Sequence, residues 1–149
     1  MTINTLLNDL EPGSEITISN VPFMYAGKAK ITLEGGDSRI WLYSQENTLL
    51  SISPDDEEMV HFRAVDEDLD TDGDFVSFQN DEFEFSYEDV GVVSDIDGDV
   101  DAEESDRFSF MEYESDKNGV LRVVLNENTG ERQIYIGQTM TEADILEVE

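Results

Sequence analysis

Apolar residues occupy every second position over several stretches of the chain, a pattern that predicts half-buried β-strands. Ile16 and Ile18 alternate with polar neighbours, and the aromatic residues Phe83, Phe85 and Tyr87 do the same later in the chain. The pattern predicts strands at residues 16–18, 23–25, 29–33, 40–43, 49–52, 60–65, 75–93, 108–113, 120–125 and 133–136. Short segments rich in Gly, Asn and Asp separate these strands, so we expect mainly antiparallel pairing through tight turns.

The two ends of the chain favour short helices. One is expected at residues 5–10, closed by Pro12 and Gly13, and a second begins after Thr141, a residue suited to cap a helix. An aromatic strand is followed by an Arg-led strand twice, at Arg39 and at Arg107. The sequence therefore predicts one all-β domain over residues 1–149, a sandwich or partly open barrel, with two similar β halves as an option.

Charge is the outlying property of the composition. The chain of 149 residues has 37 acidic and 8 basic residues, a formal net charge of −29, beside a hydrophobic share of 38% that is sufficient for a core. Self-repulsion at this charge opposes compaction, so salt, a cation or a basic partner should stabilise the fold. The same field disfavours direct binding to nucleic acid or insertion into an anionic membrane. An alternative is that the acidity, with so few lysines, serves solvation in a salt-rich cytoplasm.

Cysteine is absent from the sequence, which excludes disulfides, thiolate zinc sites and cysteine nucleophiles. The first residues have neither the basic start nor the long apolar run of a signal peptide, and no apolar stretch is long enough for a membrane helix. We therefore expect a cytoplasmic location.

The first of two acidic segments, residues 66–74, resembles the start of a calcium loop. Asp68, Asp70 and Asp72 precede Gly73, and Asp74 follows it. Alternate carboxylates can converge on one cation where a glycine permits a sharp turn, and all-oxygen ligands favour calcium over zinc. However, Gln79 stands where the bidentate Glu of such loops belongs. A solvated acidic turn is the alternative to this metal site.

The second acidic segment, residues 95–106, is the candidate surface for a partner. In an extended chain its alternate carboxylates would line one face at intervals of about 6.6 Å, which crudely imitates a nucleic-acid backbone. The alternative is an exposed loop without a partner. The candidate residues are Asp95, Asp97, Asp99, Asp101, Glu103 and Glu104.

No constellation for catalysis is visible, so we expect a protein that is not an enzyme. His61 is the only histidine, and a single histidine in a strand is more often a packed residue than a ligand or base. The sequence has no nucleophile elbow, phosphate loop or dinucleotide motif. Trp41 is expected in the core. Arg39 and Arg107 are expected at the core edge in pairs with acidic residues, with ligand anchoring as the alternative.

The order of these features resembles a bacterial family known as domain of unknown function 4178. The segments that carry the resemblance are 10–13, Trp41-Leu42 with Glu46, 83–85, 90–92, Tyr113, 119–121, Glu127, 131–137 and Asp144-Ile145. The resemblance implies an all-β accessory domain without assigned activity or catalytic residues. Relatives in that family are associated with membrane-stress and polyamine-related gene neighbourhoods. The acidic segments depart from the family pattern.

Three functional hypotheses remain. The first is an acidic module, in a bacterial membrane-stress system, that contacts a basic protein surface. The second is an inhibitor that imitates DNA, as in phage anti-defence proteins, and it is motivated by the absence of Lys and Arg between residues 64 and 106. The third is a calcium-binding β domain. The sequence leaves the oligomeric state open.

Overall fold

The fold was analysed in a computed structural model that describes residues 1–67, 69–71, 73–100, 102–117 and 119–147. Strands dominate the chain, and a short helix precedes them. The elements are α1 (Ile3–Asn8), β1 (Glu15–Ile18), β2 (Val21–Leu33), β3 (Ser38–Ser44), β4 (Thr48–Ser53), β5 (Glu58–Val65), β6 (Phe75–Phe78), β7 (Asp81–Gly98), β8 (Arg107–Glu114), β9 (Gly119–Asn126), β10 (Arg132–Met140), the 3-10 turn η1 (Glu142–Asp144) and β11 (Ile145–Glu147).

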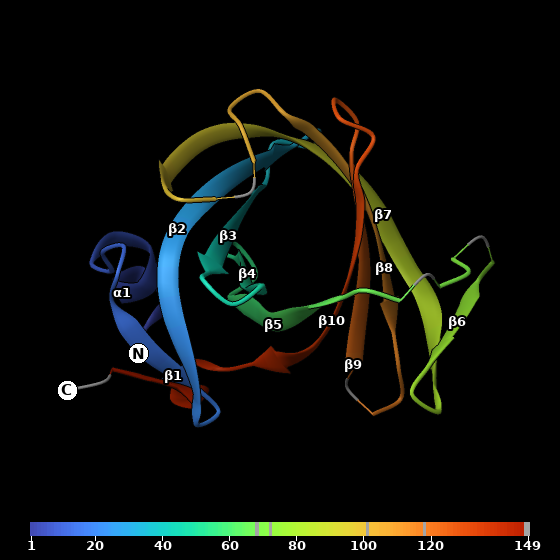
Figure 1. The fold of residues 1–149 in the computed structure, drawn as a ribbon, viewed down its shortest axis with the longest axis horizontal. Helices are drawn as coiled ribbons and strands as arrows, with labels where there is room; N and C mark the ends of the chain where they lie inside the picture. Colours follow the sequence, from blue (N-terminus) through green and yellow to red (C-terminus); the bar gives the residue numbers. More distant parts are fainter. Residues whose placement is uncertain (68, 72, 101, 118, 148–149) are drawn as a thin grey trace.

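The strands form one closed antiparallel barrel, which confirms the all-β prediction and selects the barrel over the sandwich (Figure 1). Eight strands close the ring in the order β2-β3-β4-β5-β10-β9-β8-β7, and β7 pairs back onto β2. β1 and β11 extend the sheet beyond the first half of β2, and β6 extends it beyond the first half of β7. Closure removes the free edges that β2 and β7 would otherwise expose along their paired lengths.

The barrel consists of two halves with the same strand order, β1 to β5 and β6 to β10. Each half opens with a hairpin whose two central residues have positive φ: Ser19 and Asn20 in one, Gln79 and Asn80 in the other. Positive φ at both central residues gives the turn a twist that matches the twist of the two flanking strands. Asn adopts this backbone conformation readily. The halves meet along β2–β7 and along β5–β10.

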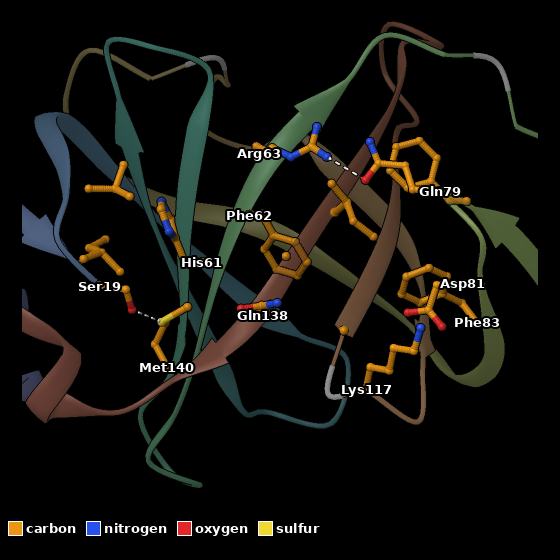
Figure 2. A pocket seen from close by; sticks show the side chains of 16 residues that line it. Ser19, His61, Phe62, Arg63, Gln79, Asp81, Phe83, Lys117, Gln138 and Met140 are labelled. Atoms are coloured by element: carbon orange, nitrogen blue, oxygen red, sulfur yellow. Dashed lines mark hydrogen bonds between the residues drawn. The ribbon is translucent and has the colours of Figure 1, made fainter.

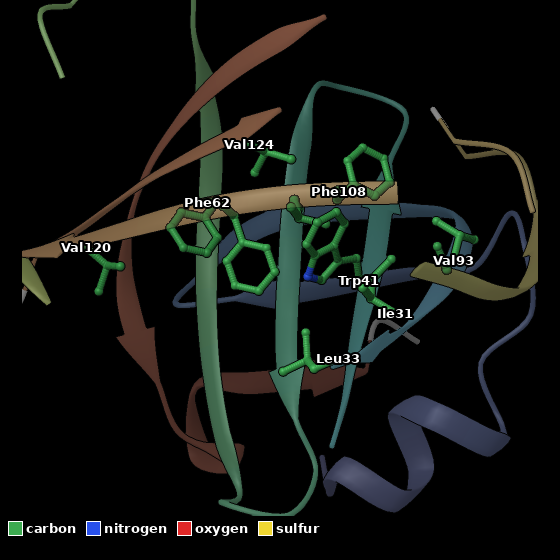
Figure 3. Packing of buried hydrophobic residues seen from close by; sticks show 11 residues of the cluster. Ile31, Leu33, Trp41, Phe62, Val93, Phe108, Val120 and Val124 are labelled. Atoms are coloured by element: carbon green, nitrogen blue, oxygen red, sulfur yellow. The ribbon is translucent and has the colours of Figure 1, made fainter. Parts of the chain in front are cut away.

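The interior of the barrel is filled by one side-chain cluster to which both halves contribute (Figure 3). Trp41 lies in this cluster with 1% of its surface exposed, as the sequence predicts, and its ring packs 5.4 Å from that of Phe108. The buried members are Ala29, Ile31, Leu33, Trp41, Leu49, Phe62, Val93, Phe108, Phe110, Val120 and Val124. A barrel of this size has an interior that side chains can fill.

Two further clusters lie on the outside of the barrel, one for each half. In the first half, Leu6 of α1 and Ile145 of β11 cover Leu42 and Leu50. In the second half, Phe78 of β6 packs with a group of residues on the outer face of β8, β9 and β10. α1 and β6 consequently lie on opposite sides of the ring (Figure 1). The outer face of β5 and β10 lies between the part of the barrel covered by α1 and β11 and the part covered by β6.

Several details differ from the sequence-based expectations. Residues 23–25 and 29–33 belong to one strand, because a bulge near Gly27 lets β2 continue instead of breaking it. The C-terminal helix is only the single turn η1, and the chain then forms β11, whose three residues are too few for a periodic pattern. Arg107 binds Glu34 and Glu127 at 2.9 and 2.7 Å, which confirms its acidic pairing, whereas Arg39 donates to the carbonyl of Ser38.

Candidate functional site: a groove between the two halves

A groove of about 500 Å³ crosses the outer face of β5 and β10, between the turns of the two hairpins (Figure 2). Its floor comes from equivalent strands of the two halves. Its walls come from the equivalent turns at residues 19–20 and 79–80, together with Lys117 from the β8–β9 connection. The groove therefore lies where the two halves of the barrel meet.

Strand alternation explains which side chains face the groove. Phe62 points into the barrel core, so its neighbours His61 and Arg63 point outward from β5. On β10, Gln138 is paired with His61 and Ile136 with Arg63, so the four side chains share one face. The period of two therefore places His61 and Arg63 on the same outer face of β5, in the lining of the groove.

Weak polar contacts hold the walls. Nη2 of Arg63 donates to Oε1 of Gln79 at 3.4 Å, and the Arg63 guanidinium lies 5.9 Å from the ring centre of Phe78. On the opposite wall, the Ser19 hydroxyl donates to Sδ of Met140 at 3.3 Å. Figure 2 shows Arg63 and Lys117 on the side of the groove that is closed by the second hairpin. The cations and the apolar rings Phe78 and Phe83 thus share one wall.

His61 occupies the other side of the groove and is partly buried against the edge of Phe23, with ring centres 6.0 Å apart. Burial lowers the pKa of His61 below its ordinary value of 6.5. The imidazole is therefore neutral at pH 7. Its Nε2 is buried and has no hydrogen-bond partner among the described residues.

The predicted calcium segment is held by the protein's own side chains. The Tyr113 hydroxyl donates to the carbonyls of Thr71 at 2.9 Å and Gly73 at 3.3 Å. Nη2 of Arg132 donates to the Thr71 hydroxyl at 2.5 Å and to the Leu69 carbonyl at 3.4 Å. These contacts fix the backbone of the segment to β8 and β10.

The four proposed calcium ligands are only partly covered by the structure. Asp70 and Asp74 are exposed, while Asp68 and Asp72 lie outside the described residues. Within the described ranges, no group of three or more His, Asp and Glu side chains has the arrangement of a metal site. The calcium site stays a prediction.

The predicted partner-binding residues divide into a strand part and a loop part. Asp95 and Asp97 are exposed on β7, where they are paired across the β2–β7 seam with Lys30 and Lys28. Asp99, Glu103 and Glu104 are exposed in the β7–β8 connection, and Asp101 lies outside the described residues. Two of the expected acidic positions are therefore locally balanced by lysines.

Asp106 fixes the β7–β8 connection to the barrel. Only 7% of its surface is exposed, and its carboxylate accepts from the Asn126 and Asn128 side-chain amides and from the backbone N–H of Glu103, at 3.0 to 3.2 Å. Ala102 packs against the interior cluster. The exposed carboxylates of this segment are therefore carried on an anchored connection.

A buried ion pair lies inside the barrel and was not anticipated from the sequence. Arg122 donates to Glu112 at 3.2 Å and to the Ser51 hydroxyl at 2.8 Å, and its guanidinium lies 4.7 Å from the ring centre of Phe62. Both charged residues are nearly inaccessible. Burial, with the neighbouring Glu112 carboxylate adding to it, raises the pKa of Tyr87 to about 12.

Comparison of the chain with protein-family models, with curated proteins and with solved structures finds no match. The resemblance to domain of unknown function 4178 therefore stays a prediction. None of the helices in the described part of the chain combines the length and apolar character that crossing a bilayer requires.

Sequence analysis missed the groove because its residues come from five separate segments. Arg63, Gln79 and Lys117 are unremarkable as isolated polar positions in the sequence. The one available indication was the period of two in β5, which places His61 and Arg63 on one face. The missing information was the barrel closure that brings the second hairpin beside them.

Proposed function

We propose that this protein is a non-enzymatic binding module whose acidic β7–β8 segment contacts a basic surface on a partner protein. The segment consists of the end of β7 and the connection to β8, residues 95–106. The exposed carboxylates Asp99, Glu103 and Glu104 form its contact face, with Asp95 and Asp97 beside them.

The anchoring of this segment by Asp106 is the observation that carries the proposal. A mobile acidic tail would lose conformational entropy on binding. Carboxylates on a fixed connection lose less, because the connection is already ordered before the partner binds. Hydrogen bonds from Asn126 and Asn128 to Asp106, and the packing of Ala102, supply this preorganisation. The arrangement favours recognition over simple solvation.

The net charge of −29 selects the chemistry of the partner. A long-range negative field accelerates the approach of a basic surface and repels acidic ones. Because exposed charges are screened by salt, the affinity should fall as ionic strength rises. A salt-adapted surface without a partner would show no such saturable binding.

One alternative uses the same acidity. An inhibitor that imitates DNA needs an unbroken row of negative charge, and Lys28 and Lys30 opposite Asp97 and Asp95 interrupt such a row. Competition between the protein and duplex DNA for a captured partner would favour this alternative. The family resemblance adds a setting for the binding module, a bacterial membrane-associated stress system.

The experiment compares two charge-matched triple variants. The first variant carries Asp99→Asn, Glu103→Gln and Glu104→Gln. The control carries Asp37→Asn, Glu57→Gln and Glu58→Gln, which are also exposed and lie outside the segment, between β2 and β3 and between β4 and the start of β5. Partners captured from a bacterial lysate at low salt are identified, purified and titrated calorimetrically against all three proteins.

The proposal predicts saturable binding that weakens with salt, is retained by the control variant and is reduced about tenfold or more by the first variant. Equal loss in both variants would show that only total charge matters. Unchanged affinity in the first variant would place the contact elsewhere and overturn the proposal.

A further inference from the structure

We propose that the groove on β5 and β10 binds a small amphiphilic anion, with an apolar body and one carboxylate or phosphate head. This site is separate from the acidic β7–β8 segment and has the opposite charge preference. Three observations carry the inference: the charges at the groove, the lack of carboxylate partners for its cations among the described residues, and its apolar lining.

Cations outnumber carboxylates in this groove, against the trend of the whole chain. Arg63 and Lys117 line it together with one acid, Asp81, whereas the complete sequence has 37 acidic and 8 basic residues. Three other hollows are lined by described residues. They hold two lysines against three aspartates, no cation against two aspartates, and one arginine against two acidic residues.

The two cations of the groove also lack an acidic partner. Arg107 and Arg122 form ion pairs, whereas no carboxylate oxygen of a described residue lies within 4.0 Å of the side-chain nitrogens of Arg63 or Lys117. Arg63 makes only its 3.4 Å contact with Gln79, a neutral amide. In a chain this rich in acids, two cations without carboxylate partners beside one cavity offer the donors that an anionic head requires.

The rest of the lining is suited to an apolar body. A volume of about 500 Å³ falls in the range of small-molecule sites. Both halves of the barrel contribute apolar side chains to it, including Ile18 and Val21 from the first and Phe78, Phe83 and Ile136 from the second.

His61 lies on the other side of the groove from Arg63 and Lys117. Its Nε2 atom is buried, so the imidazole lines the groove without contacting the anionic head. The head would lie beside Arg63 and Lys117, and the apolar body would extend across the groove toward Val21 and His61.

The net charge of the protein gives this site a distinctive salt dependence. The overall negative field repels an anion at long range, while the contacts with Arg63 and Lys117 act at short range. Salt screens the long-range repulsion more than the short-range contacts. The affinity for the anion should therefore rise with moderate salt, opposite to the affinity for a basic partner.

The test uses octanoate and octyl phosphate as probes, with octanol and octylammonium as the uncharged and cationic controls. Because His61 is the only histidine, its imidazole NMR signal reports occupancy of the groove without ambiguity. We expect a saturable shift of this signal with octanoate or octyl phosphate, a Kd on the order of 1 mM or tighter, and a higher affinity at moderate salt. The stronger of the two probes identifies the preferred head group.

The variants Arg63→Gln and Lys117→Gln should each weaken binding about fivefold to tenfold. Arg39→Gln and Lys30→Gln, which remove a positive charge away from the groove, should leave the affinity within about twofold. Backbone amide spectra verify that each variant is folded. Equal affinity for octanol and octanoate, stronger binding of octylammonium, or a His61 signal that does not respond would overturn the proposal.

Discussion

At the scale of single residues, His61 links the groove to pH. Its pKa is lowered by burial, so the unfolded chain takes up a proton at a higher pH than the folded protein does. The stability that depends on a neutral His61 is complete above the unfolded pKa of about 6.5 and is lost as the pH falls toward the folded pKa.

We predict that the His61 imidazole titrates below its ordinary value of 6.5 in an NMR titration of the folded protein. We also predict that the stability of His61→Gln rises relative to that of the wild type as the pH falls from about 7 to about 5, because the variant has no imidazole to protonate. The comparison with the variant cancels the titration of the many surface carboxylates. A His61 pKa above its ordinary value would contradict the buried, unpartnered placement.

Arg122 and Arg107 provide a matched contrast between a buried and an exposed ion pair. Arg122→Met leaves Glu112 buried without its partner, which should cost about 3–5 kcal/mol of unfolding free energy. Arg107→Met breaks the exposed contacts with Glu34 and Glu127 and should change stability little. Urea unfolding of both variants tests this contrast.

Adding Glu112→Leu to Arg122→Met should recover much of the lost stability, because it removes the unpaired carboxylate. An equal cost for Arg122→Met and Arg107→Met would contradict the buried position of the pair.

At the scale of elements, the pairing of β5 with β10 requires a glycine. A Cβ atom at Gly137 would lie 2.2 Å from the carbonyl oxygen of His61 and 2.9 Å from Cδ1 of Phe62. Gly137→Ala should therefore force the two strands apart at the groove floor. We expect a loss of about 1–3 kcal/mol in chemical denaturation.

Gly35→Ala is the control for that variant, since a Cβ atom there meets nothing within 4 Å. Its unfolding free energy should stay near that of the wild type. If the two alanine variants are equally stable, the close approach of β10 to β5 is not present in solution.

The segment 66–74 is the element on which calcium binding was predicted. Tyr113 and Arg132 already bind the carbonyls of Leu69, Thr71 and Gly73. We therefore expect millimolar calcium and magnesium to raise the melting midpoint equally, through screening of the net charge. A calcium-specific increase would instead support a site at this segment, because a ligand stabilises the state that binds it.

Local patterns predicted the strands well and the site poorly, for a physical reason. Alternation along Phe83, Phe85 and Tyr87 depends on neighbours in sequence, so it is visible without the fold. Three side-chain contacts depend instead on the pairing of strands that are distant in sequence. They are the hydrogen bond between Arg63 and Gln79, the hydrogen bond between Asn126 and Asp106, and the ion pair between Arg122 and Glu112. β11 was missed because its three residues are held by β1 and not by a pattern of their own.

At the scale of the whole molecule, both proposed sites depend on how the two halves close. The β5–β10 seam forms the groove floor, and the β2–β7 seam supports Asp95 and Asp97 beside Lys30 and Lys28. Opening the β2–β7 seam would separate Asp95 and Asp97 from Lys30 and Lys28. The charge of −29 would then lie on a flexible surface without a defined face.

The most direct test is a set of backbone NMR contacts across both seams. The closed barrel predicts cross-strand nuclear Overhauser effects between Thr32 and Val92 and between Phe62 and Gly137, since these residues are directly paired. Contacts within each hairpin should accompany them. If the hairpin contacts appear while those between Thr32 and Val92 are missing, the barrel does not close and the account of the acidic segment is contradicted. If those between Phe62 and Gly137 are missing, the account of the groove is contradicted.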